Sequence, residues 1–378
     1  MQPLRVAALM DTSIVSGPGR QLVAVARELQ DRQVELRIIT FQRRGRPASP
    51  FPDFARSRGI ACDVVEETSR LDVSVLHRVS ELVRAQGAQV LQSHSYKPAA
   101  VAAVLSRRLH LPWVGMFHGT TLEDRRVRLY NWIDQRLLRL ADRIVVVSPS
   151  QQSLFSPSSR LRLIPNAVLQ PDAPAIADPA YTSTARPRIA VIGRLSHEKG
   201  VDQFLDAMAV LRVRGFVGSA LVIGDGPDRA ALEARAKAHD LSGYVVFLGQ
   251  RADVGDLYPH LDLVVIPSRS EGMPNVLLEA IRADCPVVAT AVGAIPTIIG
   301  STAAALIVPP GNPVLLAEAI LRGLAELRSA DASEARAAIA AEYSLDRRAQ
   351  LFRSLYDEVL HHHHGLRREV LPDVMADA

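Results

Sequence analysis

The fold is decided by the stretch LVVIPSRSEGMPNVLLEAIRADCPVVAT, residues 263–290. Its runs at 263–268 and 286–290 are short, apolar and rich in β-branched residues, which indicates buried strands. Between them, residues 275–283 have the apolar spacing of an amphipathic helix. A buried strand, a crossover helix and a second buried strand form the repeating unit of a parallel sheet that helices cover on both faces.

The same alternation runs through both halves of the chain. Strands are predicted in the first half at Leu4–Leu9, Val34–Thr40, Val90–Ser93, Trp113–Phe117 and Ile144–Ser148, and in the second half at 188–193, 220–224 and 245–249. Helices are predicted at Arg20–Leu29, Ser74–Ala85, Asp124–Leu140, Gln203–Arg212, Asp228–Ala238 and Val314–Leu327. The sequence therefore predicts two doubly wound α/β domains, with ligand groups beyond the carboxyl ends of the strands and a ligand in a cleft between the domains.

A break in this alternation marks the domain boundary. Residues 170–187 are rich in Pro, Ala, Asp and Thr without any period, which is typical of a linker. The first domain is then 1–169 and the second 188–344. One more amphipathic helix is expected at Leu345–Leu360, and the four histidines that follow at 361–364 are interpreted as a solvated tail.

Composition excludes several classes of protein. The 378 residues are 48% hydrophobic and 22% charged, which is typical of a soluble globular protein. No apolar run approaches the roughly 20 residues of a membrane span, and the start MQPLRVAALMDTS indicates a strand rather than a signal peptide, so a cytoplasmic location is expected. The two cysteines cannot form a disulfide framework. A net charge of +4 suits anionic ligands or an anionic membrane, and 5% aromatic residues argue against nucleic acid.

The loop GRLSHEKG, residues 193–200, follows a predicted strand and precedes a predicted helix. It brings Arg194 and Lys199 to a helix start, where a guanidinium, an ammonium and the helix dipole together suit a phosphate. The alternative is two solvated loop cations.

The segment SRSEGMPNVLLEA, residues 268–280, also follows a strand, and Pro274 fits a helix start. Glu271 precedes this helix and Glu279 lies eight positions later, about 12 Å along a helical axis. That separation exceeds the about 5–9.5 Å of a glycosidase pair, so these acids suit opposite ends of one long ligand. The alternative is a helix-dipole acid and a surface acid. The first helical amides are expected to be free for an anion: Asn275, Val276 and Leu277.

In the first half, His118 of MFHGTT ends a predicted strand, as His94 of LQSHSYKP does with weaker support. A satisfied loop histidine is the alternative for His118. The motif SGPGRQ begins like a dinucleotide fingerprint, but Leu22 occupies the third glycine position, which argues against NAD. Gly17–Gly19 is therefore interpreted as a flexible loop that faces the cleft. No D-x-D triplet, Walker A motif, nucleophile elbow or C-x-x-C occurs, so neither a metal nor a cofactor is expected.

Together these motifs resemble the retaining glycosyltransferases of family 4 (group 1), which have the GT-B fold. EGMPNVLLEA is similar to the E-x7-E signature of that family, and the Gly-Arg-x4-Lys-Gly loop and the His-Gly strand end match in order. One departure is Asp284 in RADCPVV, where the family usually has glycine, which puts the geometry of that turn in question.

The resemblance implies a role for each matched position. Arg194 and Lys199 would hold the donor diphosphate, Glu271 would face the transferred sugar and Glu279 the ribose. His118 would lie near the anomeric carbon. Further contacts would come from the Gly17–Gly19 loop on the diphosphate, the amides near Val276 and Leu277 on phosphate or sugar, and the turn Gly249–Arg251 beside the base. The first domain, completed by residues 345–378, would hold the acceptor, and the second domain the donor.

The expected function is metal-independent, retaining transfer of a sugar from a UDP- or GDP-linked donor to a lipid-linked or saccharide acceptor in exopolysaccharide or envelope glycan synthesis. The alternatives are a nucleotide-sugar epimerase of the same fold and a nucleotide-sugar binding module without catalysis. Residues 120–143 carry six arginines with Tyr130 and Trp132, which suits peripheral contact with the inner face of an anionic membrane. An ordinary solvated helix face is the alternative for that segment.

Overall fold

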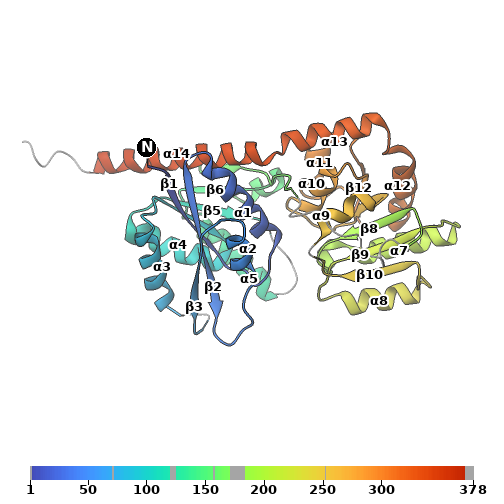
Figure 1. Ribbon diagram of the computed structural model, residues 1–378, viewed down its shortest axis with the longest axis horizontal. Coiled ribbons are helices and arrows are strands. Elements are labelled where there is room, and N and C mark those ends of the chain that lie inside the picture. The colour runs from blue at the N-terminus through green and yellow to red at the C-terminus, as the bar shows by residue number, and fades with distance from the viewer. Residues whose placement is uncertain are drawn as a thin grey trace, which may run out of the picture. The chain divides into compact units, whose positions relative to one another are not determined.

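The computed structural model describes residues 2–69, 72–119, 125–155, 158–170, 184–251 and 253–370. The chain divides into two compact units, one formed by Met1–Asn166 with Leu345–Ala378 and the other by Ala167–Ser344. Each unit is built on one parallel sheet (Figure 1). The predicted fold class of two doubly wound α/β domains is confirmed. The predicted linker 170–187 lies mostly outside the described residues.

The sheet of the first unit has the strand order β3-β2-β1-β4-β5-β6-β7. Its strands are β1 (Leu4–Met10), β2 (Val34–Arg43), β3 (Cys62–Glu67), β4 (Val90–His94), β5 (Trp113–Phe117), β6 (Arg143–Val146) and β7 (Leu161–Leu163). The order reverses at β1 and β4, and in doubly wound sheets ligands bind beside such a reversal, beyond the carboxyl ends of the strands.

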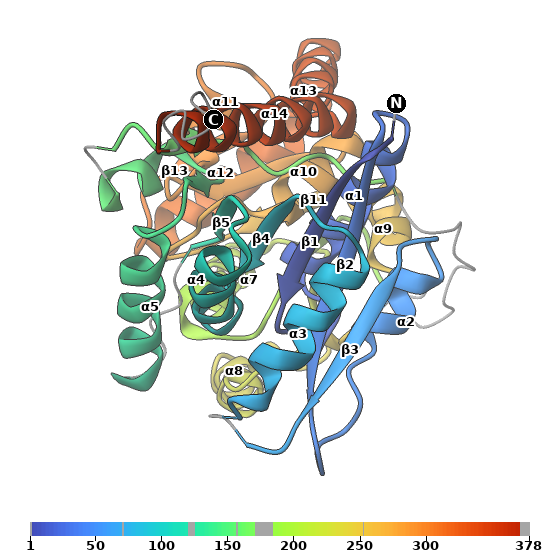
Figure 2. The ribbon, with the colours of Figure 1, turned by 90° about the vertical axis from the view of Figure 1, so that its left-hand side faces the viewer.

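Helices cover both faces of this sheet, because alternate residues of each strand point to opposite sides. On one face lie α1 (Gly17–Gln30), α2 (Phe51–Arg56) and α14 (Leu345–Val370). On the other lie α3 (Ser74–Ala85), α4 (Tyr96–Leu109) and α5 (Arg125–Leu138), of which α3 and α4 cross in front of the strands in Figure 2. The C-terminal helix thus belongs to the core of the first unit, with Phe352, Leu355 and Tyr356 buried in it.

The second unit repeats the plan with the strand order β10-β9-β8-β11-β12-β13 and its reversal at β8 and β11. Its strands are β8 (Arg188–Ile192), β9 (Ser219–Ile223), β10 (Val245–Gly249), β11 (Leu263–Ile266), β12 (Val287–Thr290) and β13 (Leu306–Val308). Helices α7 (Val201–Val213), α8 (Arg229–Ala238) and α12 (Pro313–Glu326) share one core cluster with the sheet. The other α-helices among the described residues of this unit are α9 (Val254–Leu257), α10 (Asn275–Arg282), α11 (Ile295–Ile299) and α13 (Ala330–Glu342).

Asp284 occupies the turn after α10 with a φ of +52°, in the left-handed region where the resemblance expects glycine. Its carboxylate accepts hydrogen bonds from Arg336 Nε at 2.7 Å and from Ser333 Oγ at 2.8 Å, both on α13. Asp tolerates this backbone conformation better than most residues, and the ion pair gives the 2%-exposed Arg336 a charged partner. The turn geometry is therefore kept without glycine.

Two local predictions are wrong. Helix α14 continues through His361–His364 to Val370, so this run is helical and not a tail. His361 and His362 are exposed as expected, whereas His363 Nε2 lies 2.9 Å from the carbonyl oxygen of His110. Gly17–Gly19 is not a flexible loop but the first turn of α1, where the amide of Gly19 donates to the capping Ser16 Oγ at 3.3 Å. A Cβ at Gly19 would lie 2.8 Å from the Phe51 ring, so close packing explains this glycine.

Candidate active site

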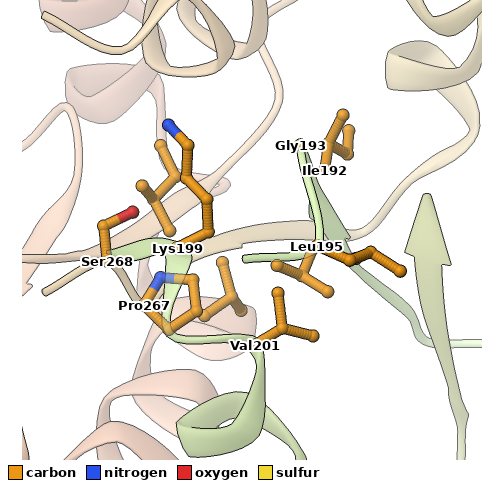
Figure 3. A pocket seen from close by; sticks show the side chains of 10 residues that line it. Ile192, Gly193, Leu195, Lys199, Val201, Pro267 and Ser268 are labelled. Carbon is orange, nitrogen blue, oxygen red and sulfur yellow. The ribbon is translucent and has the colours of Figure 1, made fainter. Parts of the chain in front are cut away.

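The two signature loops of the second unit lie at adjacent strand ends. The loop 193–200 follows β8 and the segment 267–274 follows β11, and these two strands pair in parallel. Their carboxyl ends border a small pocket that includes Gly193, Lys199, Pro267 and Ser268 (Figure 3). The strand order of the sheet therefore brings together two motifs that lie about 70 residues apart in the sequence.

Lys199 and Glu271 form an ion pair across these loops. The Lys199 Nζ donates to both carboxylate oxygens of Glu271, at 2.7 and 2.9 Å, and Ser268 Oγ donates to Oε1 at 2.7 Å. The Glu271 side chain is only 8% exposed, whereas Lys199 is 30% exposed. The carboxylate is thus held in one orientation, and the ammonium stays within reach of a ligand.

Arg269 joins the same two segments and was not singled out by the sequence. Its guanidinium donates to both carboxylate oxygens of Asp202 at 2.7 and 2.6 Å, and its amide donates to the carbonyl of Glu198 at 2.8 Å. Burial acts to raise the pKa of the Asp202 carboxyl, but the Arg269 guanidinium holds it below its usual range. Together these bonds fix the loop 193–200 and the first turn of α7 against the end of β11.

Glycines allow these backbones to approach one another. Gly200 has a φ of +64°, and a Cβ there would lie 2.1 Å from the carbonyl oxygen of Pro267. Gly293, after β12, has a φ of +59°, and a Cβ there would lie 2.3 Å from the carbonyl oxygen of Glu271. No larger residue fits at either position without moving a loop.

Helix α10 begins beside this pocket, with Pro274 at its N-cap. The amide of Leu277 donates to the carbonyl of Pro274 at 3.2 Å, so the prediction of a free amide is wrong at Leu277. Asn275 and Val276 are the first two residues of the helix, where main-chain amides precede the regular hydrogen-bond ladder.

Two other residues that were predicted to contact the sugar donor, Glu279 and Arg251, are hydrogen-bonded to neighbouring side chains. Tyr258, which is completely buried, donates to Glu279 Oε2 at 2.8 Å, and burial together with this carboxylate raises the pKa of the Tyr258 hydroxyl well above its usual range. Arg251, two residues after Gly249 with its φ of +70°, donates from Nη2 to Asp253 at 2.6 Å. Arg194 is exposed on the loop after β8.

His118 lies in the first unit, directly after β5, and makes a 2.8 Å hydrogen bond through Nε2 to Nδ1 of His94. His94 in turn contacts Gln92 at 2.8 Å, and Gln92 accepts from Tyr356 of α14 at 2.6 Å. Burial, and then the Arg348 charge, lower the pKa of His118 to about 3, so its ring is neutral at physiological pH. The sequence singled out neither Tyr356 nor Gln92, although Gln92 lies two residues before His94 in LQSHSYKP.

The described ranges contain neither a cluster of metal-ligand side chains nor a membrane-spanning helix. Over those residues, no three His, Cys, Asp or Glu side chains lie together as metal ligands would. The helices that the structure describes also include none that is long and apolar enough to cross a bilayer.

Comparisons with known proteins match both units. A family model described as Glycosyltransferase Family 4 matches residues 15–168, and one described as Glycosyl transferases group 1 matches residues 186–326. The alpha-D-kanosaminyltransferase of Streptomyces kanamyceticus is 28% identical over 317 residues, 75% of this chain and 81% of that protein. The lipopolysaccharide core biosynthesis mannosyltransferase LpcC of Rhizobium leguminosarum bv. viciae is 28% identical over 279 residues, 69% and 76% of the two chains.

Among solved structures, Anabaena HepE in complex with UDP superimposes with a TM-score of 0.77 at 20% identity, over 94% of this chain and all of that one. At this level of identity the superposition establishes a shared fold.

The ion pair between Lys199 and Glu271 yields a stability prediction. Lys199→Met and Glu271→Gln should each destabilise the protein by about 1–3 kcal/mol, because the first leaves the buried Glu271 carboxylate without its counter-ion and the second removes the charge that holds the ammonium. In the double variant the losses should not add, with a coupling of about 1–3 kcal/mol in urea denaturation. The exposed pair Arg322–Glu326 is the control, and its coupling should be much smaller. Equal couplings for the two pairs would show that Lys199 and Glu271 do not depend on each other.

Proposed function

The chain belongs to the family 4 (group 1) glycosyltransferases of the GT-B fold, and from this premise we propose that it transfers a sugar from a nucleotide diphosphate sugar, with retention and without a metal. The donor is UDP- or GDP-linked, and the acceptor is a saccharide or a lipid-linked glycan. The observation that carries the proposal is the Lys199–Glu271 pair at the carboxyl ends of β8 and β11.

The hydrogen-bond capacity of Lys199 supports its role on the diphosphate. An ammonium group carries three N–H donors, and Glu271 accepts two of them. No described residue is seen to accept the third, which leaves it for a phosphate oxygen. Arg194, on the same loop, adds a guanidinium, and the first amides of α10 add partial positive charge. These groups would stabilise the negative charge that develops on the departing diphosphate.

The contacts of Glu271 argue for hydroxyl recognition rather than nucleophilic attack. Oε1 accepts from both Lys199 and Ser268, and Oε2 accepts from Lys199, so the carboxylate charge is largely neutralised. A paired carboxylate is a poor nucleophile but a good, fixed acceptor for a sugar hydroxyl. Retention would then come from attack of the acceptor on the same face as the departing phosphate, which takes the acceptor proton.

We further propose that the first unit holds the acceptor, with His118 near the transferred sugar. Two similar proteins are named for different transfers, a kanosaminyl group in one and mannose in lipopolysaccharide core synthesis in the other. Synthesis of an envelope glycan or an exopolysaccharide, at the cytoplasmic side of the membrane, is the setting that fits a lipid-linked acceptor.

The direct test uses purified protein with UDP- and GDP-linked sugars, with and without candidate glycan acceptors. Release of nucleoside diphosphate should require an acceptor, should survive excess EDTA, and should give a product with the anomeric configuration of the donor. A new sugar epimer without an acceptor would favour an epimerase, and tight binding without turnover would favour a binding module. Loss of activity in EDTA with recovery on Mn²⁺ would contradict metal independence.

If Arg194 stabilises the departing diphosphate, its replacement should slow the chemical step. Arg194→Ala should lower kcat by about 10²–10³-fold, the usual cost of one donor that acts in the transition state. Arg194→Lys should recover only part of this, because an ammonium cannot make the bidentate contact. Arg322→Ala, on the exposed face of α12, is the charge-matched control. A kcat for Arg194→Ala within about threefold of wild type would remove Arg194 from the mechanism.

The exposed face of α5 supports an anionic membrane partner. Leu129 and Trp132 lie one turn apart and are 53% and 55% exposed, and the Arg136 guanidinium lies 5.1 Å from the centre of the Trp132 ring. An apolar surface beside arginine suits the boundary of an anionic bilayer. The protein should therefore float with anionic vesicles and not with neutral ones, and Trp132→Ser should weaken flotation. Equal recovery with both kinds of vesicle would leave α5 an ordinary solvated helix.

A further inference from the structure

Four side chains on one face of the first unit form a continuous hydrogen-bonded chain. Tyr356 Oη contacts Gln92 Oε1 at 2.6 Å, Gln92 Nε2 contacts His94 Nε2 at 2.8 Å, and His94 Nδ1 contacts His118 Nε2 at 2.8 Å. Tyr356, Gln92 and His94 are 0%, 1% and 4% exposed. The chain therefore runs from the buried face of α14 to the carboxyl end of β5, where His118 is half-buried.

The strand register explains why these residues meet. His94 of β4 lies beside Met116 of β5, and Gln92 lies beside Val114. Because strand side chains alternate between faces, Gln92 and His94 share one face with Met116 and with His118, two residues further on. Met116 belongs to the core cluster of α14, so this is the face that α14 covers.

The buried tyrosine sets the direction of the hydrogen bonds. Among the described residues, the only acceptor in contact with the Tyr356 hydroxyl is Gln92 Oε1, and a buried hydroxyl that donates to nothing is costly. Tyr356 therefore donates to the amide oxygen, which turns the amide nitrogen of Gln92 toward His94 Nε2. That ring nitrogen accepts, so the proton of neutral His94 is on Nδ1 and is donated to His118 Nε2.

Both rings have to be neutral for this pattern, since a protonated ring has no acceptor. Burial lowers the pKa of His94 and of His118, and the guanidinium of Arg348 acts in the same direction. Arg348 is held by the carbonyl of Pro165 and the side-chain oxygen of Asn166, both at 2.7 Å. Each neutral ring then has one donor and one acceptor, which is what the chain requires.

We propose that His94 is a positioning residue which, through the chain from Tyr356 and Gln92, holds His118 in the tautomer with its proton on Nδ1. His118 then offers the ligand a hydrogen-bond donor and not a base. The Nδ1 atom lies on the side of the ring away from the bond to His94. The chemical class of its partner is an oxygen acceptor, such as a sugar hydroxyl or ring oxygen, and this identification rests on the proposed function.

The tautomer can be observed without any activity. In long-range ¹H–¹⁵N spectra of histidine-labelled full-length protein, the His118 signals are assigned by their loss in His118→Gln. Nε2 should have a pyridine-type shift and Nδ1 a pyrrole-type shift. His94→Phe and Tyr356→Phe should both move the two shifts toward each other as the tautomers mix. His77→Asn, an exposed histidine on α3, should leave the His118 signals unchanged.

Kinetics separate positioning from a merely structural role. His94→Phe should lower kcat about tenfold to hundredfold with KM nearly unchanged, and His94→Asn should recover much of kcat, because its amide can still donate to His118. A pyrrole-type Nε2 in wild-type His118, or His118 shifts that do not respond to His94→Phe and Tyr356→Phe, would overturn the proposal. The expected tautomer in a protein that transfers no sugar would instead contradict the proposed function alone.

Discussion

The candidate site depends on close backbone contact between two loops of the second unit. Gly200, at the start of α7, lies against the carbonyl of Pro267, at the end of β11, so closely that no side chain fits between them. Arg269 then fastens the segment to Asp202 with two charge-assisted hydrogen bonds. With the backbones this close, Nζ of Lys199 lies 2.7 and 2.9 Å from the two carboxylate oxygens of Glu271. The charges of the site are therefore positioned by close backbone packing together with the Arg269–Asp202 ion pair.

The polar groups at the strand ends are charged in the second unit and neutral in the first. In the second unit the Lys199 ammonium is paired with the Glu271 carboxylate but stays partly exposed to solvent. Such a group can form a further ion pair with a charged ligand. In the first unit two imidazoles are held neutral by burial and by Arg348, which suits a site that recognises uncharged hydroxyls. This contrast is consistent with the proposed binding of the diphosphate by the second unit and of the sugar acceptor by the first.

The sequence predicted the fold class well because buried parallel strands are short apolar runs that stand out from the helices between them. Several of the elements that were not predicted have weak patterns: β3 carries three acids among its six residues, β7 and β13 are three residues long, and α13 is rich in alanine. Edge strands and helices of this kind are specified by their neighbours more than by their own periodicity.

At the site, residues inside loop motifs were predicted, and residues that act through packing were not. The sequence is sufficient to identify Arg194, Lys199 and Glu271, because each follows a predicted strand in a loop that contains glycine. Arg269, Gly293 and Tyr356 become relevant only when segments distant in the sequence meet. The flexible loop expected at Gly17–Gly19 was wrong because the local pattern of two glycines concealed a helix start that Ser16 caps and Phe51 packs against.

The central claim is that the joined loops after β8 and β11 bind the diphosphate. Hydrogen-exchange mass spectrometry of the full chain, with and without saturating UDP or GDP, tests it most directly, because a ligand that ties down loop amides slows their exchange locally. We expect protection to be concentrated in peptides that cover 193–200 and 268–280, and nucleoside alone should give much less. Protection confined to the first unit, or equal effects of the nucleoside and its diphosphate, would contradict it.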